Sequence, residues 1–162
     1  MASDGYTRAV IVDQHATLPA PPERVWDFMM DVPAVSRCVP GAESVSQIDP
    51  DTYDGAIRIR VGPISMRLEG RITVVERNRE ALRARMDLNA SDKRVNGQVN
   101  AKMTMTLHPR PDGQTDVDIH TDAAILGKLG EFGQPVMRKK ADQMMAEFAR
   151  NMSNEVGAAK SG

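Results

Sequence analysis

The middle of the chain alternates apolar and polar residues, and a single long helical pattern follows it. Residues 42–125 are predicted to form about six consecutive strands separated by short turns such as Gly62-Pro63. Alternation at every second residue is typical of strands with one buried and one wet face, and short turns join antiparallel neighbours. The apolar face of such a sheet must be buried against another element, and only the later helix is long enough to bury it. We therefore expect an α+β fold in which a curved antiparallel sheet wraps around one helix.

One strand and two short helices are predicted before this region, which brings the sheet to six or seven strands. The stretch Val10–Leu18 alternates like the later strands. A helix is predicted over Pro22–Asp31, because its apolar residues recur at helical steps and proline is tolerated in a first turn. Pro33 is expected to stop this helix, and a second turn or short helix is predicted over Ala34–Cys38.

The last part of the chain changes to a helical period. Apolar residues recur at three- and four-residue steps over Leu129–Met152, which predicts one long helix. Pro135 lies inside this range, so either the helix proper starts near it or the first turns are kinked. We expect a single domain over residues 1–162, with its core over about residues 10–152 and a frayed tail over residues 153–162.

Charge and cysteine content exclude several classes of protein. A net charge of −1 argues against a nucleic-acid-binding protein, which needs a surplus of basic side chains to face phosphates. A single cysteine allows no internal disulfide and is typical of a reducing compartment, so we expect a cytoplasmic protein. The first ten residues lack the pattern of a signal peptide, and no apolar run approaches the roughly 20 residues of a transmembrane helix.

Three stretches carry a resemblance to a known family. They are PERVWDFMMD with VPGAESV after it, then RVGPISMRLEGRITVVE, then ILGKLGEFG. In this order they resemble the G-subunit family of carbon monoxide dehydrogenase, which is part of the START-like (SRPBCC, helix-grip) superfamily, over Ala16 to Phe148. The chain departs from the family pattern where DVP replaces the commoner Asp-Pro, and where methionine replaces Leu or Phe at apolar positions.

The resemblance implies a helix-grip fold with a hydrophobic cavity between sheet and helix. We expect a non-enzymatic protein that binds an apolar small molecule there, such as a lipid or a quinone. The resemblance also implies a molybdenum-containing dehydrogenase of the carbon monoxide dehydrogenase type as partner, served either by assembly or by delivery of a lipophilic electron acceptor. No cofactor and no metal of its own is implied, and peripheral contact with a membrane is left open.

Strand parity and helical spacing predict which side chains line that cavity. Methionine is flexible and polarisable, and seven methionines on the facing surfaces suit an adaptable apolar guest. The predicted ligand-binding residues are Ile57, Ile59, Met66, Leu68, Met86, Leu88, Val99, Met103, Met105, Val117, Ile119, Phe132, Val136, Met137 and Met144. Two loops with flexible glycines are predicted to flank the mouth of the cavity. Their residues are Val39, Pro40, Gly41, Gly127, Gly130 and Gly133.

Two polar features are predicted to have no catalytic or metal-binding role. Cys38 has no histidine near it in the sequence, so we expect a packed side chain rather than a nucleophile. Asp116, Asp118, His120 and Asp122 alternate on one strand. Residues two apart on a strand lie about 6.5–7 Å apart, too far for several to close on one ion, so we expect a solvated outer face.

Six arginines are predicted on the outer face of three neighbouring strands, which would make that side of the sheet basic. They are Arg58, Arg60, Arg67, Arg71, Arg83 and Arg85. Such a face either docks an acidic partner or anionic headgroups, or is only solvated, and the sequence leaves both open.

Two other functions are compatible with the same pattern. A cyclase- or hydrolase-like enzyme acting on an apolar substrate would need inward polar groups. Gln98 or Asn100 could supply one if a bulge at Gly97 turned them inward, and Lys140 could supply one by reaching into the cavity. A pure interaction module would instead have a filled core. Because no inward set of titratable residues is visible, we expect a binding protein rather than an enzyme.

Overall fold

The computed structural model describes residues 8–161, except for the side chains of Ser44 and of residues 158–161. Residues 1–7 and 162 of the predicted domain lie outside the described residues. The elements follow in the order β1 (Arg8–Leu18), α1 (Pro22–Met30), α2 (Val32–Ser36), β2 (Ala42–Asp49), β3 (Thr52–Val61), β4 (Ile64–Asn78), β5 (Arg83–Asp92), η1 (Lys93–Val95), β6 (Gly97–Pro109), β7 (Thr115–Gly127), η2 (Lys128–Glu131) and α3 (Gln134–Ser161).

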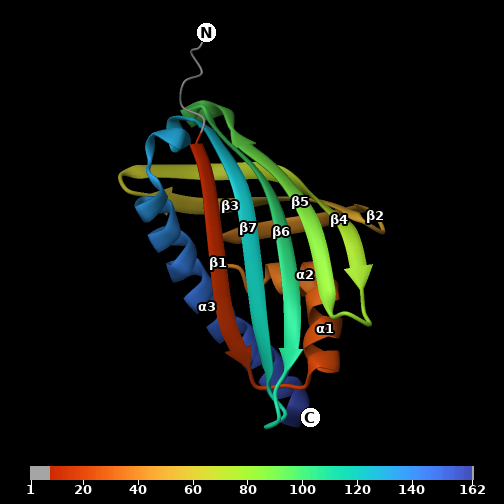
Figure 1. Ribbon diagram of the computed structural model, residues 1–162. Helices are drawn as coiled ribbons and strands as arrows, with labels where there is room; N and C mark the ends of the chain where they lie inside the picture. The colour runs from red at the N-terminus through yellow and green to blue at the C-terminus, as the bar shows by residue number, and fades with distance from the viewer. Residues whose placement is uncertain (1–7, 162) are drawn as a thin grey trace.

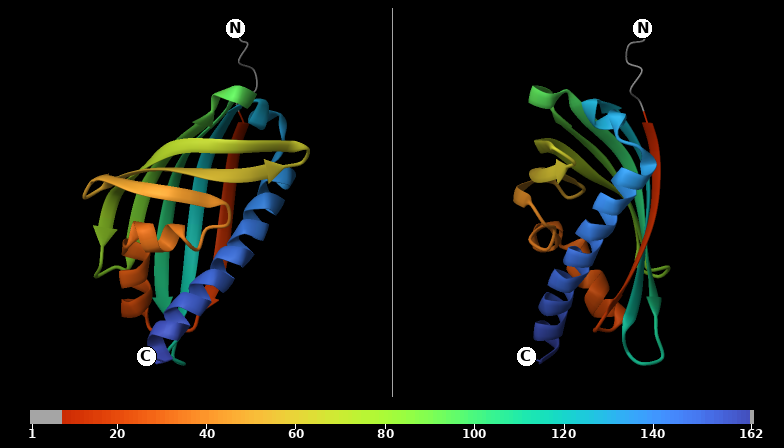
Figure 2. Two further views of the ribbon diagram at one scale, coloured as in Figure 1. Left: turned by 180° about the vertical axis from the view of Figure 1, so that it is seen from behind. Right: turned by 90° about the vertical axis from the view of Figure 1, so that its left-hand side faces the viewer.

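The strands form one antiparallel sheet of seven, in the order β1-β7-β6-β5-β4-β3-β2. Consecutive strands pair from β2 to β7, and β1 joins the far edge beside β7, with Val12 opposite Thr121. β1, β7, β6 and β5 run side by side, whereas β3 and the adjoining half of β4 run across them (Figure 1). Seen from behind, α3 lies along the concave face of the curled sheet (Figure 2). The predicted α+β fold is confirmed.

The sheet curls where β4 passes from β3 to β5. A Cβ atom on Gly70 would lie 2.2 Å from the carbonyl oxygen of Asn89 and 2.6 Å from the Cβ of Ala90. Glycine is therefore required for the close approach of β4 to β5. A register shift between Val74 and Glu76 follows, and such bulges increase the local twist. Together these two features turn the β2–β3 half of the sheet over its concave face.

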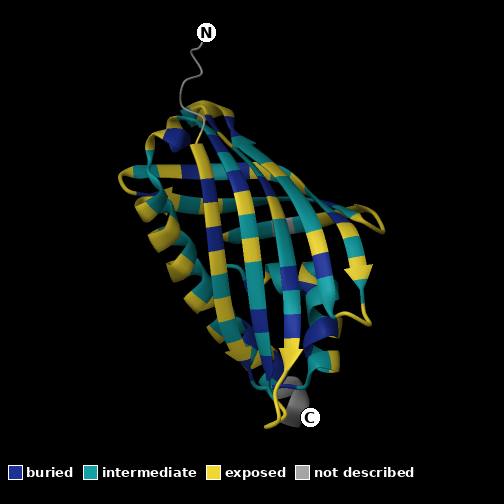
Figure 3. Ribbon diagram, viewed as in Figure 1, coloured by how far each residue is buried: buried dark blue, intermediate teal, exposed yellow. Residues whose placement is uncertain are grey.

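Concave-face side chains form two buried apolar clusters, one toward each end of the sheet. The first joins Trp26 of α1 with Met152 and Val156 of α3 against β1, β5, β6 and β7. The second packs Leu129 of η2 against the opposite ends of β1, β6 and β7 and against the β3–β4 hairpin. Buried and exposed residues alternate along the strands, as parity predicts (Figure 3).

The two short helices lie within two residues of their predicted bounds. α1 ends one residue before the predicted end. α2 begins at Val32 instead of Ala34, because an Asp31 carboxylate oxygen accepts the backbone N–H of Ala34 at 3.2 Å. Pro33 therefore lies in the first turn of α2, where its missing N–H costs no hydrogen bond, and does not separate the two helices.

The long helix begins and ends later than predicted. The first predicted turn is a separate 3-10 helix, η2, and α3 begins at Gln134 with Pro135 in its first turn. The helix proper therefore starts near Pro135, which is the first of the two predicted alternatives. A proline in the first turn of a helix causes no kink. The residues predicted to form a frayed tail are helical through Ser161, since Val156 is buried in the first cluster.

Candidate functional site

The first half of α3 is hydrogen-bonded to the sheet at the edge strand β1. The side-chain amide of Gln134 accepts the N–H of Ile11 at 3.3 Å and donates to its carbonyl oxygen at 2.7 Å. Further along, the Gln14 amide donates to the carbonyl oxygen of Ala141 at 2.7 Å. These bonds hold the helix beside β1, so any opening between helix and sheet lies on the side of β3 and β4.

A pocket of about 560 Å³ opens on that side, between α3, the β3–β4 hairpin and the loop before β2. Its apolar wall consists of Ile59 on β3, Met66 on β4 and Met144 on α3, and its rim includes Pro40 and Gly41. Small-molecule sites in proteins have volumes of about 300–1,000 Å³, so this pocket has the size of a ligand site.

The predicted ligand-binding residues fall into three groups. Four are buried inside the two clusters: Met66, Leu68, Met105 and Val117. Seven are partly buried against a cluster: Ile57, Ile59, Leu88, Val99, Ile119, Phe132 and Met137. The remaining four belong to neither cluster: Met86, Met103, Val136 and Met144. Val136 is 43% exposed on the solvent side of α3, so its predicted place on the facing stripe is wrong.

The other three residues outside the clusters are methionines on the facing surfaces of sheet and helix. Met86 pairs directly with Met103 across β5 and β6. Met144 lines the pocket and lies on α3 between Ala141 and Phe148, which pack against the two clusters. All three are half-buried. They form an apolar surface between the two packed ends of the molecule, which we call the methionine surface.

Of the residues predicted at the cavity mouth, the structure brings only the Pro40-Gly41 loop to the pocket. Gly127 has a positive φ of 73°, and a Cβ there would lie 1.9 Å from the carbonyl oxygen of Asn96. The close packing of two loops therefore explains that glycine. The predicted mouth residues that do not line the pocket are Val39, Gly127, Gly130 and Gly133.

Cys38 is a packed side chain, as predicted. It is 2% exposed in the first cluster, and burial raises the pKa of its thiol. The backbone carbonyl of Cys38 accepts a hydrogen bond at 2.9 Å from the side chain of Asn151 on α3. This residue therefore joins the α2 region to the helix, and its burial disfavours the reactive thiolate.

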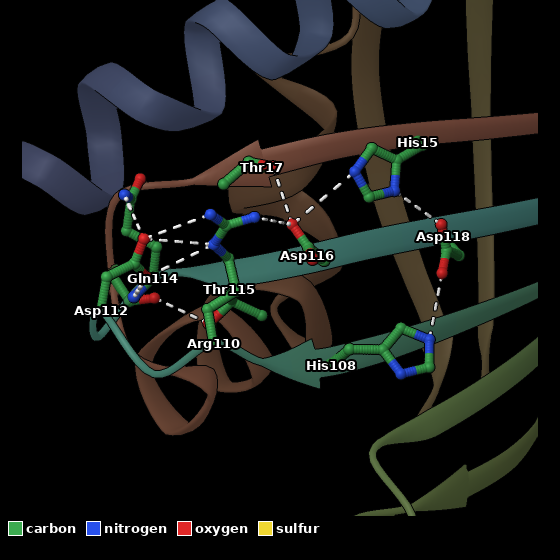
Figure 4. A network of polar contacts seen from close by, with 10 residues as sticks. His15, Thr17, His108, Arg110, Asp112, Gln114, Thr115, Asp116 and Asp118 are labelled. Atoms are coloured by element: carbon green, nitrogen blue, oxygen red, sulfur yellow. Dashed lines mark hydrogen bonds and ion pairs between the residues drawn. The ribbon is translucent and has the colours of Figure 1, made fainter.

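The acidic run of β7 lies on the outer face and forms contacts across three strands. One Asp118 oxygen lies 2.8 Å from His15 Nδ1 on β1, and the other lies 3.0 Å from His108 Nε2 on β6 (Figure 4). Asp116 accepts a hydrogen bond at 2.7 Å from Thr17. Among the residues that the structure describes, no three His, Cys, Asp or Glu side chains are arranged to bind a metal ion.

The outer arginines alternate with carboxylates, so the expected basic half of the outer face is wrong. Arg71 donates to both carboxylate oxygens of Asp54, at 2.7 and 3.1 Å, and holds the pKa of that carboxyl below its usual range. Arg58 and Arg67 share Glu43, whose pKa is lowered by their hydrogen bonds. These acids come from outward positions on β2 and β3, and their partners could be identified only from the strand register.

The polar groups that an enzyme would need are mostly on the wrong side of the sheet. β5 and β6 pair without a register shift at Gly97, so Gln98 and Asn100 stay on the outer face. Lys140 of α3 does line the pocket, as the enzyme hypothesis required.

Solved structures share this fold. A conserved protein from Geobacillus kaustophilus is similar with a TM-score of 0.82 at 22% identity, covering 91% of this chain and 95% of that chain. A START superfamily protein from Mycobacterium smegmatis has a TM-score of 0.67 at 11% identity, covering 92% and 98%. A norcoclaurine synthase from Thalictrum flavum has a TM-score of 0.68 at 13% identity, covering 95% and 98%. The fold is therefore the START-like helix-grip fold.

The sequence itself gives a narrower class. The family model of the carbon monoxide dehydrogenase G subunit (CoxG) matches residues 15–157, and the chain belongs to this family. A search of curated proteins gave no significant match. Among the described residues, no helix is long and apolar enough to cross a membrane. Family and fold together suggest a protein that binds a hydrophobic ligand.

Proposed function

We propose that this protein binds an apolar small molecule, a lipid or a quinone, between the sheet and α3, and that it is not an enzyme. The methionine surface is the observation that carries the proposal. Met86, Met103 and Met144 are apolar and half-buried, although both neighbouring clusters are closely packed. Flexible thioether side chains suit a guest of irregular shape, because they repack at little cost.

The family supports a role beside a carbon monoxide dehydrogenase. In the proposed role, the bound molecule is either the lipophilic electron acceptor of a molybdenum-containing dehydrogenase or a component used in its assembly. Both uses require reversible binding, and it is favoured because the hydrogen bonds between α3 and β1 lie away from the pocket. A ligand can enter between α3 and the β3–β4 hairpin without breaking the Gln14 and Gln134 hydrogen bonds at β1.

A cyclase- or hydrolase-like enzyme is the second candidate, and Lys140 in the pocket favours it together with the similarity to norcoclaurine synthase. Against it, Gln98 and Asn100 face outward, which leaves Lys140 without a polar partner from β6. General acid–base catalysis needs groups positioned on the reacting atoms. Conversion of the co-purified molecule by wild type, lost in Lys140→Met, would establish the enzyme.

The proposal is tested first by native mass spectrometry of the purified protein, followed by extraction into organic solvent. We expect an adduct whose mass matches a lipid or quinone in the extract. A protein that carries no adduct, and binds none of the lipids and quinones of its host when these are added back, would contradict the proposal and leave an interaction module.

A substitution on the methionine surface gives a second test. Met103→Arg should abolish uptake of the extracted molecule, because an arginine there must lose its hydration when an apolar guest enters. The variant should still fold, since Met103 is half-buried and lies outside both clusters. Thr104→Arg, one residue along on the outer face, is the matched control and should bind like wild type. Failure of Met103→Arg to fold, with Thr104→Arg folded, would mean that Met103 lies in packed core.

A further inference from the structure

The pocket beside the methionine surface has a strongly one-sided charge. Five of its lining residues are basic and none is acidic. The basic residues are Arg58 and Arg60 on β3, Arg67 on β4, Arg94 on η1 and Lys140 on α3. Binding of a neutral apolar molecule would not explain why cations from four separate elements line one pocket.

Three of these five cations already have carboxylate partners nearby. Arg58 and Arg67 share Glu43, and Arg67 also pairs with Glu69. Arg94 lies 3.2 Å from a carboxylate oxygen of Asp92. Asp92 is buried and also accepts the backbone N–H groups of Arg67 and Arg94, so its charge is fixed in place beside the pocket.

Arg60 and Lys140 are the two cations that have no acidic partner among the described residues. The Nε of Arg60 donates only to the carbonyl oxygen of Gly62 in its own hairpin, at 3.4 Å, and the two terminal guanidinium nitrogens form no hydrogen bond in the described part of the chain. Lys140 forms no ion pair there either. One cation stands on the hairpin side of the opening and the other on the helix side.

The apolar wall lies directly beside these two cations. Ile59 and Arg60 are consecutive residues of β3, and both line the pocket. Met144 follows Lys140 by four residues on α3, so the two lie on the same helix face. The pocket therefore changes from charged to apolar within one residue on the strand and one turn on the helix.

We propose that this pocket binds the carboxylate or phosphate head of an anionic amphiphile, between Arg60 and Lys140, with the alkyl chain over Ile59, Met66 and Met144. Arg60 offers two adjacent N–H donors to such an oxyanion, and Lys140 offers a point charge opposite them. The inference rests on the proposed function and narrows it, because it selects an anionic amphiphile over a neutral quinone.

The test compares four probes by isothermal titration calorimetry at neutral pH. Decanoate and decyl phosphate carry both a chain and an anion, decanol carries the chain alone, and inorganic phosphate carries the anion alone. Wild type should bind decanoate and decyl phosphate at least tenfold more tightly than decanol. Inorganic phosphate should bind far more weakly than decyl phosphate, because it lacks contacts with the apolar wall.

Two double variants of equal charge decide which cations are responsible. Arg60→Gln with Lys140→Gln should remove the preference for the anionic probes and leave decanol binding unchanged. Arg85→Gln with Lys139→Gln is the control, since both residues are exposed and neither lines the pocket. The control should keep the wild-type preference, which separates local contacts from the general effect of net charge.

Glu43→Gln gives an independent check in the opposite direction. It removes the carboxylate shared by Arg58 and Arg67, so Arg58 loses its carboxylate partner while Arg67 keeps Glu69, and the affinity for decanoate should rise several-fold. An unchanged or lower affinity would contradict the electrostatic explanation.

The remaining outcomes separate this inference from the proposed function. Equal binding of decanoate and decanol by wild type would overturn the anionic headgroup and leave hydrophobic binding intact. Equal binding of inorganic phosphate and decyl phosphate would overturn the amphiphile and leave a simple anion site. If no alkyl probe binds and the purified protein carries no adduct, both the inference and the proposed function are wrong.

Discussion

Cys38 shows how burial decides the chemistry of a side chain. Desolvation is the main reason why the pKa of its thiol is raised, the charge of Glu155 adds to the effect, and the charge of Arg37 opposes it. The thiolate is the reactive form of cysteine, so these surroundings disfavour the reactive form of Cys38. The sequence predicted this role correctly, because no histidine or other base stands near Cys38 to activate it.

Cys38→Ser should leave ligand binding unchanged and lower the free energy of unfolding by about 1–2 kcal/mol, because a hydroxyl replaces a thiol at a buried position. Urea unfolding followed by the fluorescence of Trp26, which is buried in the same cluster, measures the change. In wild type, iodoacetamide should label the native thiol far more slowly than the unfolded one. Equal labelling rates, or loss of binding in a stably folded Cys38→Ser, would show that the thiol is accessible or functional.

Side-chain parity predicted the concave face well but did not predict its packing. Met66 and Met105 proved to be buried in clusters, whereas Met86 and Met103 on the same face are half-buried. Alternation gives only the direction in which a side chain points. Whether a neighbouring element covers that side chain depends on the curl of the sheet at Gly70. The curl brings β3 over one end of the concave face, and it results from the close approach of β4 to β5 at this glycine.

At the level of elements, the end of α3 was the largest error. Ser153, Asn154 and Glu155 interrupt the apolar repeat after Met152, where a frayed tail was predicted. The structure shows that Val156, four residues after Met152, is 1% exposed in the cluster with Trp26. A single apolar residue on the correct face is enough to continue a helix when a tertiary partner covers it.

Val156→Ala should therefore destabilise the protein by about 2 kcal/mol, because it removes two buried carbon atoms and leaves a cavity beside Trp26. Asn154→Ala is the control, since this side chain is exposed on the same turn and should change stability little. Thermal unfolding of both variants gives the comparison. If Val156→Ala unfolds at the same temperature as Asn154→Ala, the last turns of α3 contribute nothing to the folded state.

Over the whole molecule, the outer face of the sheet is a network of ion pairs rather than separate basic and acidic halves. The pKa values of Glu43, Asp54 and Glu76 are lowered, in each case chiefly by a hydrogen bond from an arginine on a neighbouring strand. Exposed pairs of this kind each contribute little near neutral pH. The sequence showed that these residues face outward, but it could not show their partners, because pairing depends on strand register.

These lowered pKa values predict acid sensitivity. A carboxyl group whose pKa is lower in the folded than in the unfolded protein stabilises the folded state above about pH 4.3, the ordinary pKa of glutamate. This contribution to stability is lost as the pH falls through the pKa of the folded state. Urea unfolding between pH 3 and 7 should show stability falling at the acid end. Glu43→Gln should reduce that slope, whereas Glu80→Gln should not, because Glu80 forms no ion pair among the described residues. Identical slopes in all three proteins would contradict the prediction.

The hydrogen bonds between Gln134 and Ile11 have a consequence for contacts between molecules. β1 is an edge strand, and an exposed edge invites another chain to add its own strand. The Gln134 amide occupies both the N–H and the carbonyl oxygen of Ile11, as a neighbouring strand would. The side chain that anchors α3 thus also blocks sheet extension at this residue, and the helix protects the protein from self-association along the edge that it covers.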